Sequence, residues 1–161
     1  MRTCVFPGSF DPVTRGHMDL IERAAALFDR VTVTVMINRN KQGSFPVSKR
    51  RELLEKACAG LDNVTVDLWD GLLVDYLRAR GENTVIRGVR NTSDFEAESI
   101  SAQANRMLFP EMETVILFAG DGKNAISSSA VREIASFGGS VAEFVPEQVQ
   151  EEINTFFGLK D

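Results

Sequence analysis

Hydrophobic positions along the chain follow two kinds of pattern. Short runs rich in β-branched residues, typical of strands, occupy residues 3–6, 31–37, 64–69, 84–86 and 113–118. After each run, apolar residues recur at three- and four-residue intervals, which predicts helices. These helices are expected directly after His17 as far as residue 28, over residues 49–59, 72–80, 93–108 and 130–135, and from residue 146 onward.

This alternation of strands and helices predicts an α/β fold in which a doubly wound, five-stranded parallel sheet has helices on both faces. No internal repeat, low-complexity tract or linker interrupts the pattern, so we expect a single domain over residues 1–161. The carboxyl ends of parallel strands form one edge of such a sheet, where open α/β sheets bind ligands. The loops that follow the strands are therefore the place to look for chemistry.

Composition narrows the class of protein. The chain has 161 residues, of which 43% are hydrophobic, enough to bury a substantial core. Its formal net charge of −5 argues against general affinity for nucleic acid or acidic membranes, because such binding is mostly charge neutralisation. No leader or membrane-length apolar run is evident, and Cys4 and Cys58 have neither disulfide nor zinc spacing. We expect a soluble protein of the reducing cytoplasm, with both thiols in its core.

The loop over residues 7–17 has the features of an anion site. Gly8 and Gly16 allow a ligand to approach the main chain, and the helix that follows offers unpaired N–H groups and a positive dipole end. His17, the one histidine of the chain, lies at this helix start, and an incoming polyphosphate is expected to raise its pKa. The alternative is an ordinary turn with His17 as a surface cap.

Three other loops at the same edge carry groups that suit phosphate. Lys41 follows the second strand, and Arg87-Gly88-Val89-Arg90 follows the fourth, where arginine forks can take phosphate oxygens in pairs. Residues 127–129 are three serines at a helix start. The alternatives are a solvated lysine, surface ion pairs to Asp94, Glu96 or Glu98, and simple helix capping. Four such loops at one edge together predict a site for a nucleoside triphosphate and a second anion.

With these residues in view, the chain resembles the bacterial phosphopantetheine adenylyltransferases, nucleotidyltransferases with a [TH]-x-G-H motif. The resemblance covers the chain up to the final helix, and its motifs occur in family order: Pro7-Gly8-Ser9-Phe10-Asp11-Pro12, Thr14-x-Gly16-His17, Lys41-x-x-x-Phe45, Ile86-Arg87-Gly88-Val89-Arg90, Asp94-Phe95-Glu96, Asn105-Arg106 and Ile126-Ser127-Ser128-Ser129. It implies a Rossmann-like fold, a homohexamer and transfer of AMP from ATP to 4′-phosphopantetheine, giving dephospho-coenzyme A and pyrophosphate.

The resemblance also implies roles for individual residues. The catalytic set would be Ser9, His17, Lys41 and Arg90. ATP would be bound by Ser9, Phe10, His17, Gly88, Val89, Arg90, Glu98, Lys123, Asn124, Ala125, Ile126, Ser127, Ser128 and Ser129. Phosphopantetheine would be bound by Ser9, Lys41, Leu72, Leu73, Arg87 and Asn105. Mg²⁺ would be held mainly by substrate phosphates and water, with no protein ligand set. Coenzyme A is a candidate feedback ligand.

Two other functions stay open at this point. A sister nucleotidyltransferase would use a different phosphorylated acceptor, such as nicotinamide mononucleotide or glycerol 3-phosphate. A nucleotide-binding module without catalysis would bind ATP but release no pyrophosphate with any acceptor.

Overall fold

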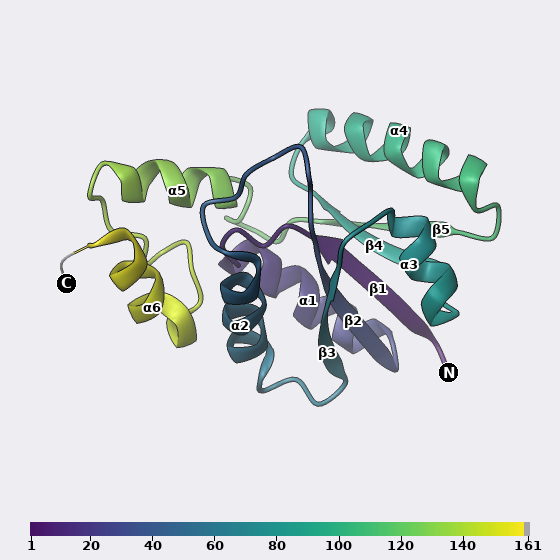
Figure 1. Cartoon of the computed structure of the whole chain (residues 1–161), viewed down its shortest axis with the longest axis horizontal. Helices are drawn as coiled ribbons and strands as arrows, with labels where there is room; N and C mark the ends of the chain where they lie inside the picture. The colour runs from purple at the N-terminus through teal and green to yellow at the C-terminus, as the bar shows by residue number, and fades with distance from the viewer. Residues whose placement is uncertain (160–161) are drawn as a thin grey trace.

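The computed structural model describes residues 1–159 and shows a parallel sheet between two layers of helices (Figure 1). Its five strands lie in the order β3-β2-β1-β4-β5. The strands are β1 (Thr3–Gly8), β2 (Arg30–Met36), β3 (Val64–Trp69), β4 (Thr84–Val89) and β5 (Glu113–Phe118). The helices are α1 (Arg15–Leu27), α2 (Val47–Cys58), α3 (Leu73–Arg80), α4 (Thr92–Leu108), α5 (Ser128–Ser136) and α6 (Glu147–Phe157).

Alternate residues of β1 enter two separate hydrophobic cores, because successive side chains of a strand point to opposite faces. Cys4 and Phe6 lie in the larger core, to which α1, α2, α5 and α6 contribute. Val5 lies in the smaller core with residues of α3. The doubly wound arrangement, with β1 at the centre of the sheet, is therefore confirmed.

The prediction that both cysteines are core residues is also confirmed. Cys4 and Cys58 are buried free thiols. Burial raises the pKa of Cys4 to about 12 and that of Cys58 to about 11, with smaller effects from Glu82 and Glu22 respectively. Neither thiol forms a thiolate at neutral pH, which removes both from the candidate nucleophiles.

Three local predictions were wrong. Helix α1 begins at Arg15 with Thr14 as its N-cap, so His17 lies inside the first turn and not before the helix. Strands β1 and β4 continue to Gly8 and Val89, beyond the apolar runs that predicted them, because their pairing with neighbouring strands continues through these glycine-bearing segments. The cationic run Lys49-Arg50-Arg51 in the sequence most simply predicts a solvated helix face, but Arg50 is buried.

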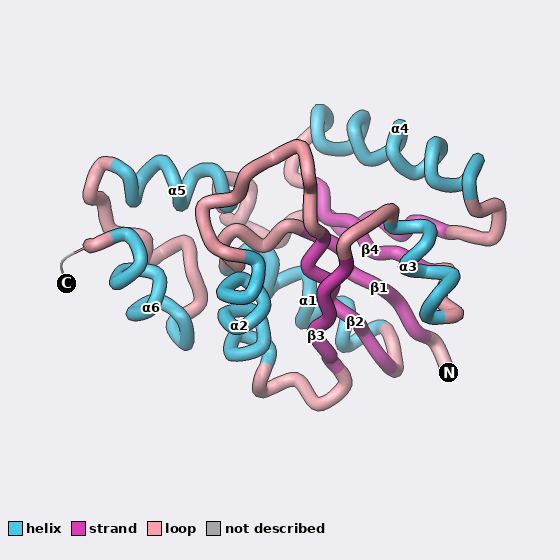
Figure 2. Tube along the Cα trace, viewed as in Figure 1, coloured by secondary structure: helices cyan, strands magenta, loops and turns pink. Residues whose placement is uncertain are grey.

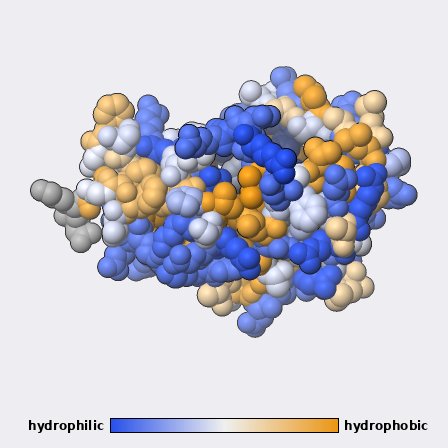
Figure 3. Space-filling view, in the orientation of Figure 1, coloured by the Kyte–Doolittle hydropathy of each residue, from blue (hydrophilic) through white to orange (hydrophobic). Residues whose placement is uncertain are grey.

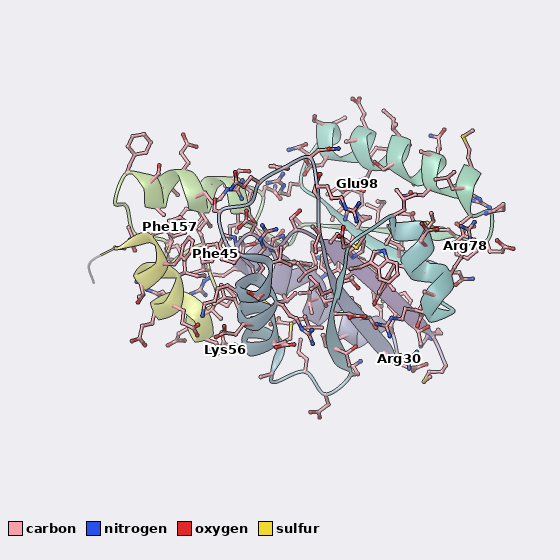
Figure 4. The ribbon with its side chains drawn as sticks, in the orientation of Figure 1. Arg30, Phe45, Lys56, Arg78, Glu98 and Phe157 are labelled. Atoms are coloured by element: carbon pink, nitrogen blue, oxygen red, sulfur yellow. The ribbon has the colours of Figure 1, made fainter. Side chains whose placement is uncertain are left out.

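Helix α6 holds the end of the loop that joins β2 to α2. The ring of Phe45, at the end of this loop, stacks on that of Phe156 at a centroid distance of 3.8 Å and meets Phe157 edge-on (Figure 4). The loop, residues 37–46, runs from the sheet past the start of α5 (Figure 2). Anchoring at Phe45 therefore limits where Lys41, four residues earlier, can lie.

Helix α4 is packed differently from the others. None of its 17 residues is fully buried; Phe95 is about half exposed, and Ile100 and Met107 are largely exposed. Phe118, on the edge strand β5, is also exposed. In Figure 3, hydrophobic surface lies on the α3 and α4 side of the molecule and at the centre of the view. Within residues 1–159, no helix combines the length and apolar character that crossing a bilayer requires.

Candidate active site

Three cavities meet at Ser9, directly after β1, at the edge formed by the carboxyl ends of the strands. Cavity I, of about 330 Å³, is lined by the loops after β1, β4 and β5. Cavity II, of about 400 Å³, lies between the sheet and α4, and cavity III, of about 150 Å³, lies between the Lys41 loop and the start of α5.

Cavity I brings together most of the residues predicted for ATP. They come from β1 and its loop, α1, β4, α4 and the loop before α5, and comprise Ser9, Phe10, His17, Gly88, Val89, Arg90, Glu98, Lys123, Ile126, Ser127, Ser128 and Ser129. Gly16 lets α1 approach this cavity closely, since a Cβ there would lie 3.3 Å from the carbonyl oxygen of Ile126. The prediction that loops from distant parts of the chain share one edge is therefore confirmed for these residues.

His17 is held in a reciprocal cap at the start of α1. Its backbone N–H donates to Oγ1 of Thr14 at 3.2 Å, while the Thr14 backbone N–H donates to Nδ1 of His17 at 3.1 Å. This is a capping box in which histidine takes the place usually held by glutamate or glutamine. Because Nδ1 accepts a hydrogen bond, the proton of the neutral ring lies on Nε2. The ring also packs edge-on against Phe10, with centroids 4.9 Å apart.

The surroundings of His17 favour its neutral form. Burial, followed by the positive charges of Arg90 and Arg87, lowers its pKa from 6.5 to about 4. The ring is thus a neutral Nε2–H donor at pH 7 in the protein alone. The rise expected when a polyphosphate binds starts from this low value, and it stays a prediction.

The low pKa of His17 makes stability depend on pH. Between about pH 4 and 6.5 the unfolded chain binds a proton on His17 that the folded protein does not. The free energy of unfolding is therefore expected to fall as the pH falls through this range, by up to about 3 kcal/mol. NMR titration of the single imidazole and urea unfolding from pH 4 to 7 measure both effects.

The matched control for this pH dependence is His17→Gln, which cannot titrate in the same range. Carboxylates that titrate near pH 4 affect the stability of both proteins. The difference between their free energies of unfolding at each pH therefore gives the contribution of His17 alone. An imidazole that titrates at pH 6 or above in the folded protein would contradict the proposed neutral donor.

Both arginines of the β4 segment form ion pairs at the cavity wall. Arg87 donates to the two carboxylate oxygens of Glu98 at 2.9 and 2.7 Å, and Glu98 points from α4 toward the sheet (Figure 4). Arg90 donates to Asp94 at 2.9 and 3.3 Å, which lowers the Asp94 pKa. The alternative that these arginines form ion pairs with neighbouring acids is thus correct for Asp94 and Glu98. These pairs orient guanidinium groups that line cavity I, so they are compatible with anion binding.

The three serines before α5 do different things. Ser127 is the N-cap and accepts from the Ala130 N–H at 3.1 Å. Ser128 donates to the Pro12 carbonyl at 2.8 Å, which ties α5 to the loop after β1. Ser129 accepts from Arg132 at 3.2 Å. Capping thus explains one serine, and the other two line both cavity I and cavity III.

Cavity II receives part of the set predicted for phosphopantetheine. Ser9, Leu73, Arg87 and Asn105 line it, together with Met112 and other residues of α4 and the neighbouring strands. Leu72 lies at the N-cap of α3 and is 60% exposed, outside the three cavities. Lys41 lines cavity III and not cavity II.

Two further predicted residues, Asn124 and Ala125, do not line the three cavities, although they lie between Lys123 and Ile126, which do. Lys123 is held 3.6 Å from Asp19. Among residues 1–159, no cluster of three or more histidine, cysteine, aspartate or glutamate side chains could hold a metal ion.

Sequence reasoning missed the residues that hold the site together. The buried carboxylate of Asp11 accepts from the N–H groups of Ser44 and Phe45 at 2.9 and 2.8 Å, and it lies near Arg50 and Arg132. It thereby fastens the Lys41 loop to the loop that leads to His17. The spacing Thr14-x-x-His17 could have revealed the cap, but no sequence signal connects Asp11 with residues more than thirty positions away.

The chain is similar to known nucleotidyltransferases over almost its whole length. The model of the family described as Cytidylyltransferase-like matches residues 5–134. Among solved structures, one from Vibrio parahaemolyticus, provisionally named nicotinate-nucleotide adenylyltransferase, has a TM-score of 0.69 and covers 98% of this chain and 96% of its own. At 16% identity, this likeness supports the fold alone.

Sequence relatives are more specific. The phosphopantetheine adenylyltransferase of Rubrobacter xylanophilus is 45% identical over 100% of this chain and 98% of its own length. The enzyme of the same name from Finegoldia magna is 48% identical over 97% and 96%, and that from Deinococcus radiodurans is 51% identical over 88% and 86%. Given this identity and coverage, the chain belongs to the phosphopantetheine adenylyltransferase family.

Proposed function

We propose that this protein transfers the adenylyl group of ATP to 4′-phosphopantetheine, forming dephospho-coenzyme A and pyrophosphate. The observation that carries the proposal is the meeting of three cavities at Ser9, beside the neutral donor His17. Cavity I would hold the nucleotide, and cavity II would hold the acceptor. Membership of the family supports the identity of the acceptor.

The reaction needs positioning and charge stabilisation more than it needs a strong base. A phosphate monoester is already anionic near neutral pH, so its oxygen can attack the α-phosphorus of ATP directly. The new oxygen–phosphorus bond forms while the bond to the bridging oxygen breaks, and that oxygen keeps the electron pair as pyrophosphate leaves. What the protein supplies is alignment of two anions and hydrogen-bond donors to the developing charge.

His17 would donate to the α-phosphoryl group. Its Nε2–H is available because Nδ1 is occupied by the Thr14 N–H. Arg90 and Lys41 would offset the remaining charge, from cavity I and cavity III respectively. Ser9, which lines all three cavities, would contact the reacting phosphate groups.

The acceptor would lie along cavity II with its phosphate at Ser9 and Arg87. Leu73 and Asn105 line the same cavity and would contact the pantetheine arm. Leu72, at the N-terminus of α3, would complete the apolar surface only at the outer end of the arm. Coenzyme A shares this arm with the substrate, so it would compete for cavity II as a feedback ligand.

Magnesium would reach the site on the triphosphate. Asp94 and Glu98 line cavity I but are paired with Arg90 and Arg87, so phosphate oxygens and water are the ligands left for the cation. Bound in this way, Mg²⁺ would neutralise charge on the phosphate chain.

Pyrophosphate release from ATP tests the proposal directly. The protein is expected to release pyrophosphate with 4′-phosphopantetheine and to release little with nicotinamide mononucleotide or glycerol 3-phosphate. Preference for either of the other acceptors would establish a sister nucleotidyltransferase. ATP binding without release in any mixture would establish a silent nucleotide-binding module.

Assembly into a homohexamer in the cytoplasm is the remaining part of the proposal. The exposed apolar residues of α4, including Ile100 at 70% exposure and Met107 at 86%, support burial against further copies of the chain. Light scattering at micromolar concentration is expected to measure the mass of six chains. A monomeric mass would contradict the assembly and leave the proposed chemistry unaffected.

A further inference from the structure

Lys123 is held differently from Arg87 and Arg90, the two arginines that line cavity I with it. Each arginine donates two hydrogen bonds to a carboxylate, with donor–acceptor distances between 2.7 and 3.3 Å. The Lys123 ammonium lies 3.6 Å from Oδ1 of Asp19, which is beyond hydrogen-bond distance, so charge alone holds the pair together. The lysine side chain is long and flexible. Lys123 is therefore the cation of cavity I that a ligand can redirect most easily.

Asp19 of α1, by contrast, is fixed in place. Its Oδ2 accepts from the backbone N–H of Gly120 at 3.1 Å and from Arg23 at 3.2 Å, and Arg23 also donates to the Phe118 carbonyl at 2.6 Å. Gly120 permits this close approach, because a Cβ there would lie 2.9 Å from both carboxylate oxygens. The side chain of Asp19 is only 16% exposed. The carboxylate therefore stays where it is, while Lys123 can move.

Asp19 does not line cavity I, but Lys123, which it attracts, does. The negative charge of Asp19 opposes a polyphosphate in this cavity in two ways: it repels the phosphate oxygens, and it competes with them for Lys123. A triphosphate carries more negative charge than one carboxylate, so it can take Lys123 from Asp19. The contact between Asp19 and Lys123 is then lost each time a nucleotide binds, which lowers the affinity for the nucleotide.

We propose that Asp19 binds Lys123 in the unliganded protein, and that Lys123 exchanges the Asp19 carboxylate for a phosphate oxygen when ATP binds. This inference rests on the proposed function. Asp19 is thus a positioning residue that lowers the affinity for ATP through Lys123, and it also ties the loop between β5 and α5 to α1 at Gly120. The exchange transfers no proton and breaks no covalent bond. Its effect therefore falls on nucleotide binding, and kcat for AMP transfer is expected to stay within about twofold.

The test measures ATP binding by calorimetry, with magnesium, for Asp19→Asn, Lys123→Gln and the double variant. Asparagine keeps a side-chain oxygen for the Gly120 N–H and removes the charge that competes for Lys123. Asp19→Asn is expected to lower the Kd for ATP about 3- to 10-fold, and Lys123→Gln is expected to raise it by a similar factor. In the Lys123→Gln background, Asp19→Asn is expected to change the Kd by less than about twofold, because the two residues act as a pair.

The matched control is Asp75→Asn, which removes a carboxylate of α3 that pairs with Arg78 at 3.5 Å and does not line cavity I. It is expected to leave the Kd for ATP unchanged, so net charge alone does not explain the effect of Asp19→Asn. Adenosine, which has no phosphate, is expected to bind all of these variants equally. If Asp19→Asn does not fold, Asp19→Ser is the second variant, since its hydroxyl can also accept from the Gly120 N–H.

Three results would overturn the inference. An unchanged or raised Kd for ATP in Asp19→Asn would make Asp19 a structural support of the loop with no competing role. The full gain in affinity in the Lys123→Gln background would mean that Asp19 repels ATP directly, without an exchange of Lys123. Equal tightening of adenosine and ATP binding in Asp19→Asn would mean that Lys123 does not contact phosphate.

ATP binding separates this inference from the proposed function, because it requires neither an acceptor nor turnover. Tighter ATP binding by Asp19→Asn supports the exchange even in a protein that forms no dephospho-coenzyme A, a result that would reject the proposed function alone. Unaltered ATP binding by Asp19→Asn, in a protein that does form dephospho-coenzyme A, rejects the exchange and leaves the function intact.

Discussion

Replacing His17 with alanine is expected to lower kcat about 100- to 1,000-fold, while KM for ATP changes much less. The imidazole provides a preorganised Nε2–H donor, and removing one such donor from a site where charge develops has an effect of this size. The donor is specific to this ring because Thr14 occupies Nδ1 and because burial with Arg87 and Arg90 keeps the ring neutral. Single-turnover measurement of AMP transfer checks the prediction.

The informative control is His17→Gln, whose amide N–H can replace part of the imidazole. It is expected to retain more activity than His17→Ala. His17→Ala loses the acceptor for the Thr14 N–H, at a cost of about 1 kcal/mol in stability, whereas the glutamine side chain can accept this hydrogen bond as in the usual capping box. The circular dichroism of both variants should match that of the unaltered protein. Near-normal turnover in His17→Ala would remove His17 from the mechanism.

Replacing Asp11 with alanine is expected to lower the free energy of unfolding by about 3–5 kcal/mol, because it leaves buried partners without their counter-charge. The N–H groups of Ser44 and Phe45 would lose their acceptor, and Arg50, only 8% exposed, would lose its carboxylate. The Lys41 loop would also lose its link to the loop before α1. Urea unfolding, followed by the fluorescence of the single tryptophan, measures the change.

Asp11→Asn serves as the graded control for this prediction. Its amide oxygen can accept one of the two N–H groups, although its NH₂ group offers no charge to Arg50. We expect a loss of stability between zero and that of Asp11→Ala, and a KM for ATP closer to normal. Equal stability of Asp11→Ala and the unaltered protein would show that the loop is held by Phe45 packing alone.

Much of the site could be predicted from the sequence, because the anion-binding groups come shortly after predicted strands. Because all strands of the sheet are parallel, these loops had to lie at one edge, and this placed His17, Arg90 and Ser128 in cavity I. The ends of the helices were harder to predict. The cap that moved the start of α1 to Arg15 uses a histidine where a carboxylate or amide is usual.

The residues that escaped prediction act through contacts between distant segments. Asp11 binds the N–H of Phe45 across 34 positions, and Arg132 binds the Asp11 carbonyl across 121. Arg50 lies in a run of cations that looks solvated, yet its guanidinium Nε donates to the Phe45 carbonyl in the interior. No local pattern carries these pairings, since they depend on where separate loops meet after the sheet has formed.

The sequence by itself determined the order of strands and helices along the chain, the presence of helices on both faces of the sheet and the gathering of anion-binding loops at one edge. It could do so because the spacing of hydrophobic residues indicates each helix and strand locally. The alternation of strands and helices then indicates parallel strands, whose carboxyl ends lie at one edge of the sheet. Only the tertiary structure decided which nitrogen of His17 carries the proton, that Lys41 lies in cavity III, and that Arg132 and Asp11 belong to the site. Those features depend on distances of a few ångströms between groups from different loops, and hydrogen bonds and charge pairs change most steeply over that range.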